Sequence, residues 1–243
     1  MFSNRSSILR SGSLAAGALA AVAAIGLAVG TASAAVITVL NPNFASPAEP
    51  STGTTWSTVG TPTSPGADTA IADWGVSAPS AGGVTTGVVY YSSSIGQVCY
   101  GNGNGESTYN VYQDVGTLQA NTQYTLTVDI IANANGQLNG ASAAIELVNT
   151  ASDSNPNTQS ATGTTLNSQT GTCNQTLTPI TTSYTTGRTV SGDLSIELVM
   201  PQYGQSMYTN VGLTSSAVPE PASLGLMAIG ALGLLLLKRR RTV

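Results

Sequence analysis

Carboxylates are the only abundant ionisable groups in the middle of this 243-residue chain. Residues 35–217 hold ten of them against one basic residue, Arg188, so this region carries a net charge of −9. The ten are Glu49, Asp68, Asp73, Glu106, Asp114, Asp129, Glu146, Asp153, Asp193 and Glu197. Two carboxyls roughly 5 to 9 Å apart can cleave a glycosidic bond, which keeps a carboxylate glycosidase open as a third hypothesis. Nucleic acid is disfavoured as a partner, because polyanions are held by clustered Lys and Arg.

The chain contains no histidine, and its only lysine is Lys238. A Ser-His-Asp or Cys-His constellation therefore cannot be assembled, and zinc, copper and haem sites lose their commonest ligand. From this composition we expect no catalytic residue, no cofactor and no enzymatic activity. The glycine-alternating residues 101–106 could offer oxygens to calcium, but Glu106 is their single carboxylate, so a hairpin connection is favoured and no metal is predicted.

Aromatic rings are the side chains best suited to hold a sugar, because the apolar C–H faces of pyranose rings lie against them. The candidates for ligand binding are Trp74, Trp56, Tyr90, Tyr91 and Tyr100. The alternative is that the tryptophans fill the core, since residues 35–217 contain a single phenylalanine.

Short strands must position these side chains. Residues 123–130 alternate strictly between apolar and polar, and residues 194–200 repeat the pattern with Ser195 and Glu197 directed outward. Further strands are predicted at 36–40, 84–91, 107–115, 143–148, 183–189 and 207–213. Two segments are predicted to be loops, 45–80 and 149–178, although part of the second can pair because Thr and Ser are compatible with strands. The predicted fold class is all-β, an antiparallel β-sandwich or jelly roll.

The N-terminus has the order of a secretory signal peptide. Arg5 and Arg10 precede an apolar run at 14–29, which leads to Ala32-Ser33-Ala34 with cleavage expected before Ala35. Residues 1–34 are therefore predicted to be a signal helix removed by signal peptidase, with a retained N-terminal anchor as the alternative.

Three unlike segments follow one another at the C-terminus: Val218-Pro219-Glu220-Pro221, the uncharged residues 222–237, and Lys238-Arg239-Arg240-Arg241. A transmembrane helix over 222–237 would span roughly 24 Å, slightly less than a hydrocarbon core of roughly 30 Å. The basic cluster should stay cytoplasmic, which leaves everything before Pro219 on the far side of the membrane.

This order resembles the PEP-CTERM sorting signal of Gram-negative bacteria, here at 218–243. The resemblance implies a transient anchor in the inner membrane and cleavage by an exosortase near Pro219-Glu220-Pro221. It also implies that the mature protein, residues 35–217, reaches the cell surface or an extracellular polysaccharide matrix. A plain C-terminal anchor is the alternative.

Cys99 and Cys173 both fall in the part expected to be exported, where an oxidising compartment permits pairing. A disulfide between them would stabilise the fold by roughly 4 kcal/mol in the chain-entropy model. A nucleophilic thiol is the alternative, but it lacks an activating base.

Three short motifs, 40–44, 112–126 and 208–213, resemble the galactose-binding-like β-jelly-rolls of bacterial surface proteins and carbohydrate-binding modules. The resemblance implies a jelly-roll fold for residues 35–217. Two positions depart from that family: its acidic residue after Phe44 is Ala45 here, and its Asp before Asn210 is Thr209. These positions often help to hold a structural calcium, so that ion is allowed but not supported.

We expect a non-catalytic exported protein of the cell surface or matrix, acting in biofilm through association with exopolysaccharide. A lectin-like module with a defined glycan ligand is the leading alternative.

Overall fold

All regular structure in the described part of the chain is β-strand. The computed structural model describes residues 33–46, 66–67, 71, 73–76, 85–102, 109–132, 141–150, 163–200 and 205–218, and Ser33–Val218 form one compact unit. Strand pairing is antiparallel throughout these residues, which confirms the predicted all-β class. Within the same ranges, no helix has the length and apolar character needed to cross a bilayer. The predicted signal helix, the helix at 222–237 and the basic cluster lie outside the described residues.

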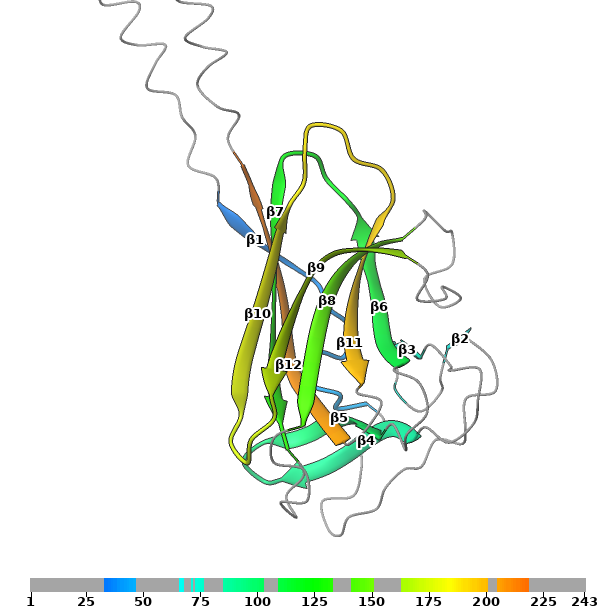
Figure 1. The fold of residues 1–243 in the computed structure, drawn as a ribbon, viewed down its shortest axis with the longest axis vertical. Helices are drawn as coiled ribbons and strands as arrows, with labels where there is room; N and C mark the ends of the chain where they lie inside the picture. The colour runs from blue at the N-terminus through cyan, green and yellow to red at the C-terminus, as the bar shows by residue number, and fades with distance from the viewer. Residues whose placement is uncertain are drawn as a thin grey trace, which may run out of the picture. The chain divides into compact units, whose positions relative to one another are not determined.

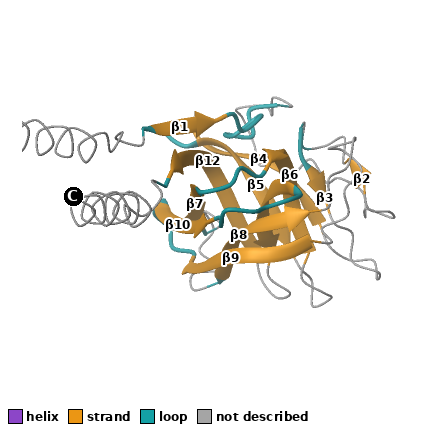
Figure 2. Ribbon diagram, turned by 90° about the horizontal axis from the view of Figure 1, so that it is seen from above, coloured by secondary structure: helices purple, strands orange, loops and turns teal. Residues whose placement is uncertain are grey.

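The strands form two sheets, which we call sheet A and sheet B (Figures 1 and 2). Sheet A has the order β10 (Thr178–Thr185), β7 (Thr122–Ile131), β12 (Gln205–Ala217), β5 (Gly96–Asn102) and β4 (Thr85–Ser92), and β1 (Ala34–Ile37) also pairs with β12. Sheet B has the order β2 (Gly66–Ala67), β3 (Gly75–Val76), β6 (Tyr109–Thr117), β11 (Asp193–Met200), β8 (Ser142–Thr150) and β9 (Gly163–Thr172).

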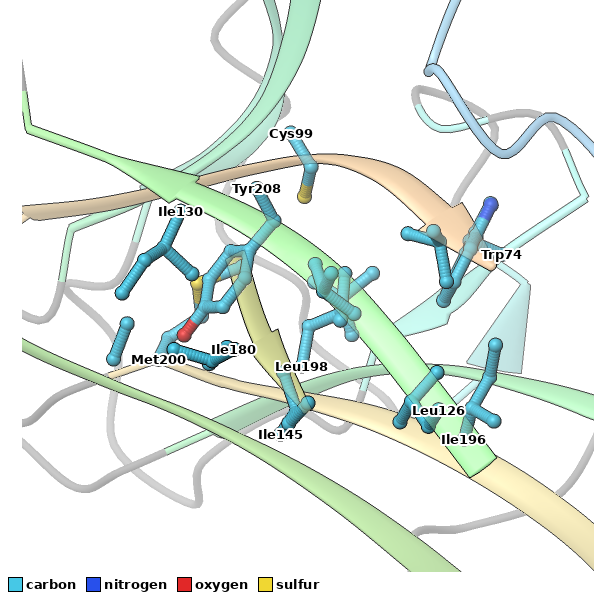
Figure 3. Packing of buried hydrophobic residues seen from close by; sticks show 14 of the residues in the cluster. Trp74, Cys99, Leu126, Ile130, Ile145, Ile180, Ile196, Leu198, Met200 and Tyr208 are labelled. Atoms are coloured by element: carbon cyan, nitrogen blue, oxygen red, sulfur yellow. The ribbon is translucent and has the colours of Figure 1, made fainter. Parts of the chain in front are cut away.

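The inner faces of the two sheets enclose one large apolar core, which contains side chains from both. Alternation along β7 buries Tyr124, Leu126, Val128 and Ile130, as predicted. Burial of such side chains is the main stabilising contribution, about 1.5 to 3 kcal/mol for each large aliphatic group. Tyr208 ties the layers together, because it projects from β12 into this core and donates a hydrogen bond to the Val199 carbonyl of β11 at 2.5 Å (Figure 3).

Three strands lie in segments predicted to be loops. β2 and β3 fall within 45–80, and β9 falls within 149–178. β9 carries mostly exposed polar residues because it is the last strand of sheet B, bonded only to β8, and buries almost nothing. A strand of this kind shows no apolar alternation, so the sequence pattern could not indicate it.

The predicted disulfide between Cys99 and Cys173 is not found in the structure, and both side chains are fully buried. They pack as small apolar groups in the main core, where Cys99 lies beside Tyr208 (Figure 3). Both thiols are close enough to Tyr208 to raise the pKa of its hydroxyl, although burial is the larger cause. Burial likewise raises the pKa of the Cys173 thiol to about 11, which keeps it protonated and unreactive.

Candidate functional site

The centre of the site is β11, which is buried on both faces. Its inner face supplies Leu194, Ile196 and Leu198 to the core. Its outer face was predicted to be solvent-exposed, yet Ser195 is 1% exposed and Glu197 is 2% exposed. A carboxyl group thus lies in the interior, on the face of sheet B that points away from the core.

Strand register brings three polar side chains to Glu197. Tyr112 of β6 and Glu146 of β8 are its direct partners on either side, and Asn110 of β6 donates a hydrogen bond to Glu197 Oε2. We call Glu197, Glu146, Asn110 and Tyr112 the carboxyl cluster. Directly paired residues of antiparallel strands have Cβ atoms about 4.5 to 5.5 Å apart, so the two carboxylates face each other across the strand pair.

Two polar atoms of this cluster are buried without a hydrogen-bond partner among the described residues: Glu197 Oε1 and the Tyr112 hydroxyl. Burying such an atom unpaired costs about 1 to 3 kcal/mol, so its persistence in a native site calls for an explanation. Each of these two atoms is open to a hydrogen bond with a polar ligand, Glu197 Oε1 as an acceptor and the Tyr112 hydroxyl as a donor.

Burial, with a smaller contribution from the charge of Glu146, raises the pKa of Glu197 to about 7, and the Asn110 hydrogen bond opposes both effects. Burial also raises the pKa of Tyr112, and the Glu197 charge adds to that shift. At neutral pH a substantial fraction of Glu197 is therefore protonated. A buried carboxyl that titrates near neutrality can act as a general acid.

Glu146 is the more accessible carboxyl of the pair. It is half-buried, and its Oε2 accepts a hydrogen bond from the Thr165 hydroxyl of β9 at 3.1 Å. The pair thus combines a buried proton donor with a partner that remains in contact with solvent.

Gly75 of β3 forms the floor of the site next to Tyr112. Gly75 is paired with Tyr112, and a Cβ built on Gly75 would lie 2.5 Å from Tyr112 Cζ. The ring therefore lies directly over the glycine, and any side chain there would displace it. This close approach is the structural reason for a glycine in β3.

The structure places Trp74 in the core instead of on a ligand platform. Its side chain is 2% exposed, and its ring centroid is 5.2 Å from that of Phe44. The indole N–H donates to the Leu40 carbonyl at 3.1 Å, and Figure 3 shows the ring nitrogen directed away from the other labelled core residues. The alternative weighed from the sequence, that tryptophan fills the core, describes Trp74 correctly.

The other aromatic candidates that the structure describes lie on β4 and β5. Tyr100 is 6% exposed in a second, smaller apolar cluster with Val89, Val98, Ile131 and Met207. Tyr91 is half-buried against that cluster, and its hydroxyl donates to the Ala132 carbonyl at 3.0 Å. Tyr90 is half-buried on β4, and Trp56 lies outside the described residues.

Glu146 and Glu197 are two of the ten carboxylates in the sequence, and neither was distinguished from the other eight. Asn110 and Tyr112 were not predicted as site residues. One signal was present: Glu197 stands between Ile196 and Leu198, with Val199 as its outward neighbour. An outer face that carries valine beside glutamate is less polar than a solvated face usually is. No group of three or more Asp, Glu or Cys side chains suited to a metal ion occurs among the described residues.

Two sequence families match the chain. The HpiC1-like family, described as HpiC1 cyclase, matches residues 35–214. The PEP-CTERM protein-sorting motif matches residues 217–241, which confirms the resemblance seen in the C-terminal sequence. No curated protein is similar in sequence to the chain.

Two solved cyclase structures share the fold, and a carbohydrate-binding domain is more distantly similar. The apo form of a cyclase from Fischerella sp. is 19% identical with a TM-score of 0.56, and the match covers 77% of this chain and 99% of that one. A cyclase from Fischerella sp. TAU is also 19% identical, with a TM-score of 0.53, and the match covers 77% of this chain and all of that one. A xylan-binding domain from Paenibacillus barcinonensis gives 14% identity and a TM-score of 0.38 over 60% of this chain and 87% of that one. At these identities the likeness concerns the fold.

Proposed function

We propose that this chain, which belongs to the HpiC1-like family and carries a PEP-CTERM protein-sorting motif, is an exported protein with a reactive site. In this proposal the sandwich domain donates a proton to a small molecule at the carboxyl cluster. The composition led us to expect no enzyme. Membership of a family described as a cyclase weakens that expectation, and the carboxyl cluster supplies an acid that needs no histidine.

One observation carries the proposal: Glu197 is buried, titrates at about 7 and has an oxygen without a partner among the described residues. A structural carboxylate in a sheet normally gains its stability from hydrogen bonds to both oxygens or from a paired cation. Glu197 has Asn110 on one oxygen only, and its burial together with the charge of Glu146 favours the protonated form in spite of that bond.

Ring closure is the reaction that best fits this acid. Glu197 would transfer its proton to an unsaturated or carbonyl group of the ligand, and the electron-deficient carbon would bond to a second unsaturated group in the same molecule. Loss of a proton from the cyclised cation would restore the Glu197 carboxyl, either directly or through Glu146. The product is an isomer of the substrate, so no oxidant, reductant or cofactor is consumed.

The test is an isomerisation assay with the full chain purified in detergent. Citronellal, an unsaturated aldehyde that closes to a ring in acid, serves as one probe beside a panel of acyclic dienols. The wild type should form products of unchanged mass and altered chromatographic retention, and Glu197→Gln should lose at least tenfold in rate, in line with the contribution of about 10²–10⁴ typical of general acids. Equal rates for the two proteins, or no isomer from any probe, would argue against the assignment.

A second function, association with a neutral polysaccharide, is supported by the outer face of sheet A. Thr127 and Thr181 share a hydrogen bond of 3.0 Å there, and Gln123, Ser183 and Thr185 are exposed beside them. Hydroxyl and amide groups without a nearby cation suit the hydroxyls of a neutral glycan. In this function the exported protein contributes to biofilm by contact with exopolysaccharide at the cell surface.

Cosedimentation with the exopolysaccharide of the producing cell separates the two functions. If sheet A binds the polymer, Thr181→Val combined with Ser183→Val should reduce the bound fraction, whereas Glu197→Gln should not. Retention that is unaffected by the double substitution would remove the glycan function from this face.

A further inference from the structure

The turn that opens the domain, residues 40–46, is closed by side-chain N–H groups at the place where related jelly rolls use a cation. We infer that the N–H groups of Gln113 and Trp74 bind the carbonyl oxygens that a structural calcium would otherwise bind. The chain then folds and remains stable without that ion. The inference concerns the stability of the domain and does not depend on the proposed reaction.

Backbone geometry turns several carbonyl oxygens of this segment toward one another. Asn41 and Phe44 have positive φ values of 46° and 54°, and Asp73 on the facing segment has a φ of 69°. The Asn41 side chain fixes the turn, since it donates to the Ser46 carbonyl at 2.7 Å and accepts from the Ser46 N–H at 3.1 Å. Converging carbonyl oxygens are electronegative, and calcium is the ion that such a set prefers.

Gln113 of β6 directs its positively polarised amide hydrogens at these carbonyl oxygens. Its Nε2 donates to the Leu40 carbonyl at 3.0 Å and to the Asp73 carbonyl at 2.9 Å, while its Oε1 accepts from the Leu40 N–H at 2.8 Å. The side chain is 5% exposed, so these bonds are shielded from water. Trp74 adds a second donor, with Nε1 3.1 Å from the Leu40 oxygen and 3.3 Å from the Asn41 oxygen.

The other carbonyls of the turn are also held by protein donors. Gln97 Nε2 donates to the Phe44 carbonyl at 2.8 Å, and the Val211 N–H donates to the Pro42 carbonyl at 3.0 Å.

The two positions where the resemblance would place acidic ligands do not fit calcium. Ala45 offers no side-chain oxygen, and the buried Thr209 hydroxyl donates to the Gln97 carbonyl at 3.3 Å. Calcium takes 6–8 oxygen ligands and is attracted by carboxylates. A cluster in which the carbonyls already accept N–H bonds, and in which Ala45 and Thr209 supply no carboxylate, is a poor calcium site.

The hydrogen bonds of Gln113 and Trp74 also fix β3, the strand that lies next to Tyr112 of the carboxyl cluster. Trp74 precedes Gly75, and Gln113 follows Tyr112, so the bond from Gln113 to the Asp73 carbonyl joins the two strands one residue from the Gly75–Tyr112 pair. The closure therefore fixes β3 on β6 at the register that the site requires.

One substitution should convert the closure into a calcium site. Gln113→Glu removes the amide donor and places a carboxylate oxygen against the Leu40 and Asp73 carbonyls, which repel it unless a cation binds between them. The experiment measures Tm of the full chain in detergent, with CaCl2 and with a chelator. Gln97→Glu is the matched control, because it exchanges the same groups at another carbonyl of the turn, that of Phe44.

The wild type should show the same Tm in both solutions. Gln113→Glu should melt several degrees lower in chelator and recover most of that loss in calcium, whereas Gln97→Glu should melt lower in both. A wild-type Tm that falls on chelation, or a Gln113→Glu protein that calcium does not restore, would overturn the inference. If Gln113→Glu does not fold in either solution, calcium titration of the wild type decides: no saturable heat supports the inference, and stoichiometric binding that raises Tm refutes it.

Discussion

Glu197 affects both the stability of the domain and its proposed function. It lies on an outer sheet face, where a charged side chain costs nothing if water reaches it, yet it is 2% exposed and has a second carboxylate as its neighbour. The protein accommodates this by favouring the neutral form. A proton-transfer site needs an acid of this kind, whose pKa burial has raised toward neutrality.

The raised pKa of Glu197 makes part of the stability depend on pH. An unfolded glutamate titrates at its usual value of 4.5 and the folded one at about 7, so between these values the folded state binds more protons than the unfolded state. The free energy of unfolding must then fall as pH rises from about 4.5 to about 7, by about 3 kcal/mol in total, and level off above that range. Urea unfolding of the wild type and of Glu197→Gln should differ by this trend, and parallel pH profiles would contradict it.

Two buried tyrosines provide a matched test of the unpartnered hydroxyl. Tyr112 is 1% exposed with no partner for its hydroxyl among the described residues, whereas the Tyr124 hydroxyl, on a residue 2% exposed, accepts from the Gln119 N–H at 2.7 Å. Tyr112→Phe should leave the free energy of unfolding unchanged or raise it, and Tyr124→Phe should lower it by about 1 kcal/mol. A loss at Tyr112 equal to that at Tyr124 would mean that the Tyr112 hydroxyl has a structural partner.

At the scale of the elements, sheet B positions the site through its central strand and its edge. β11 brings Glu197 between β6 and β8, and the short strand β3 brings Gly75 beneath Tyr112. Because β3 is only two residues long, its register depends on the Gln113 and Trp74 hydrogen bonds more than on its own ladder.

Gly75→Ala should therefore weaken the domain by about 1 to 3 kcal/mol, the usual cost of overpacking, because the new Cβ would approach Tyr112 Cζ to 2.5 Å. Gly187→Ala is the control, since a Cβ built there meets nothing within 4 Å. Chemical denaturation of the two variants measures the difference. Equal midpoints for both would show that β3 can move away without cost.

Sequence predicted the elements well where one face is apolar and the other polar. β7 alternates as expected because its outer face meets solvent, and the positive φ of Asn121, 50°, gives the expected turn before it. The pattern did not indicate β9, which buries almost nothing, and the prediction was wrong for the outer face of β11, which is covered despite being polar. The site was missed for the second reason: no local pattern reveals that the neighbours of a glutamate on adjacent strands are tyrosine and another glutamate.

At the scale of the whole molecule, the chain joins an exported sandwich to a sorting motif at 217–241. The order of Pro219-Glu220-Pro221, the apolar residues 222–237 and the basic cluster indicates an anchor that an exosortase removes. Residues 35–217 carry a net charge of −9, which favours neutral ligands over polyanions.

Processing can be read from the mass of the chain outside the inner membrane. Wild-type protein should lack residues 1–34 and 218–243, whereas a chain with Pro219→Ala and Glu220→Ala should keep its C-terminus and remain in the membrane fraction. Ser215→Ala, outside the motif, is the control and should behave as the wild type. Wild-type molecules recovered at the surface with residues 235–241 intact would contradict exosortase cleavage.

The most direct test of the account is the titration of the Glu197 carboxyl itself. Carbon NMR of the full chain with labelled glutamate side chains would follow this carbon from pH 4 to 9, with Glu197→Gln to assign its signal. We predict that the Glu197 carboxyl titrates with its midpoint at about pH 7. A midpoint near the usual 4.5 would show a solvated carboxylate, and the proton donor on which the proposed function depends would be absent.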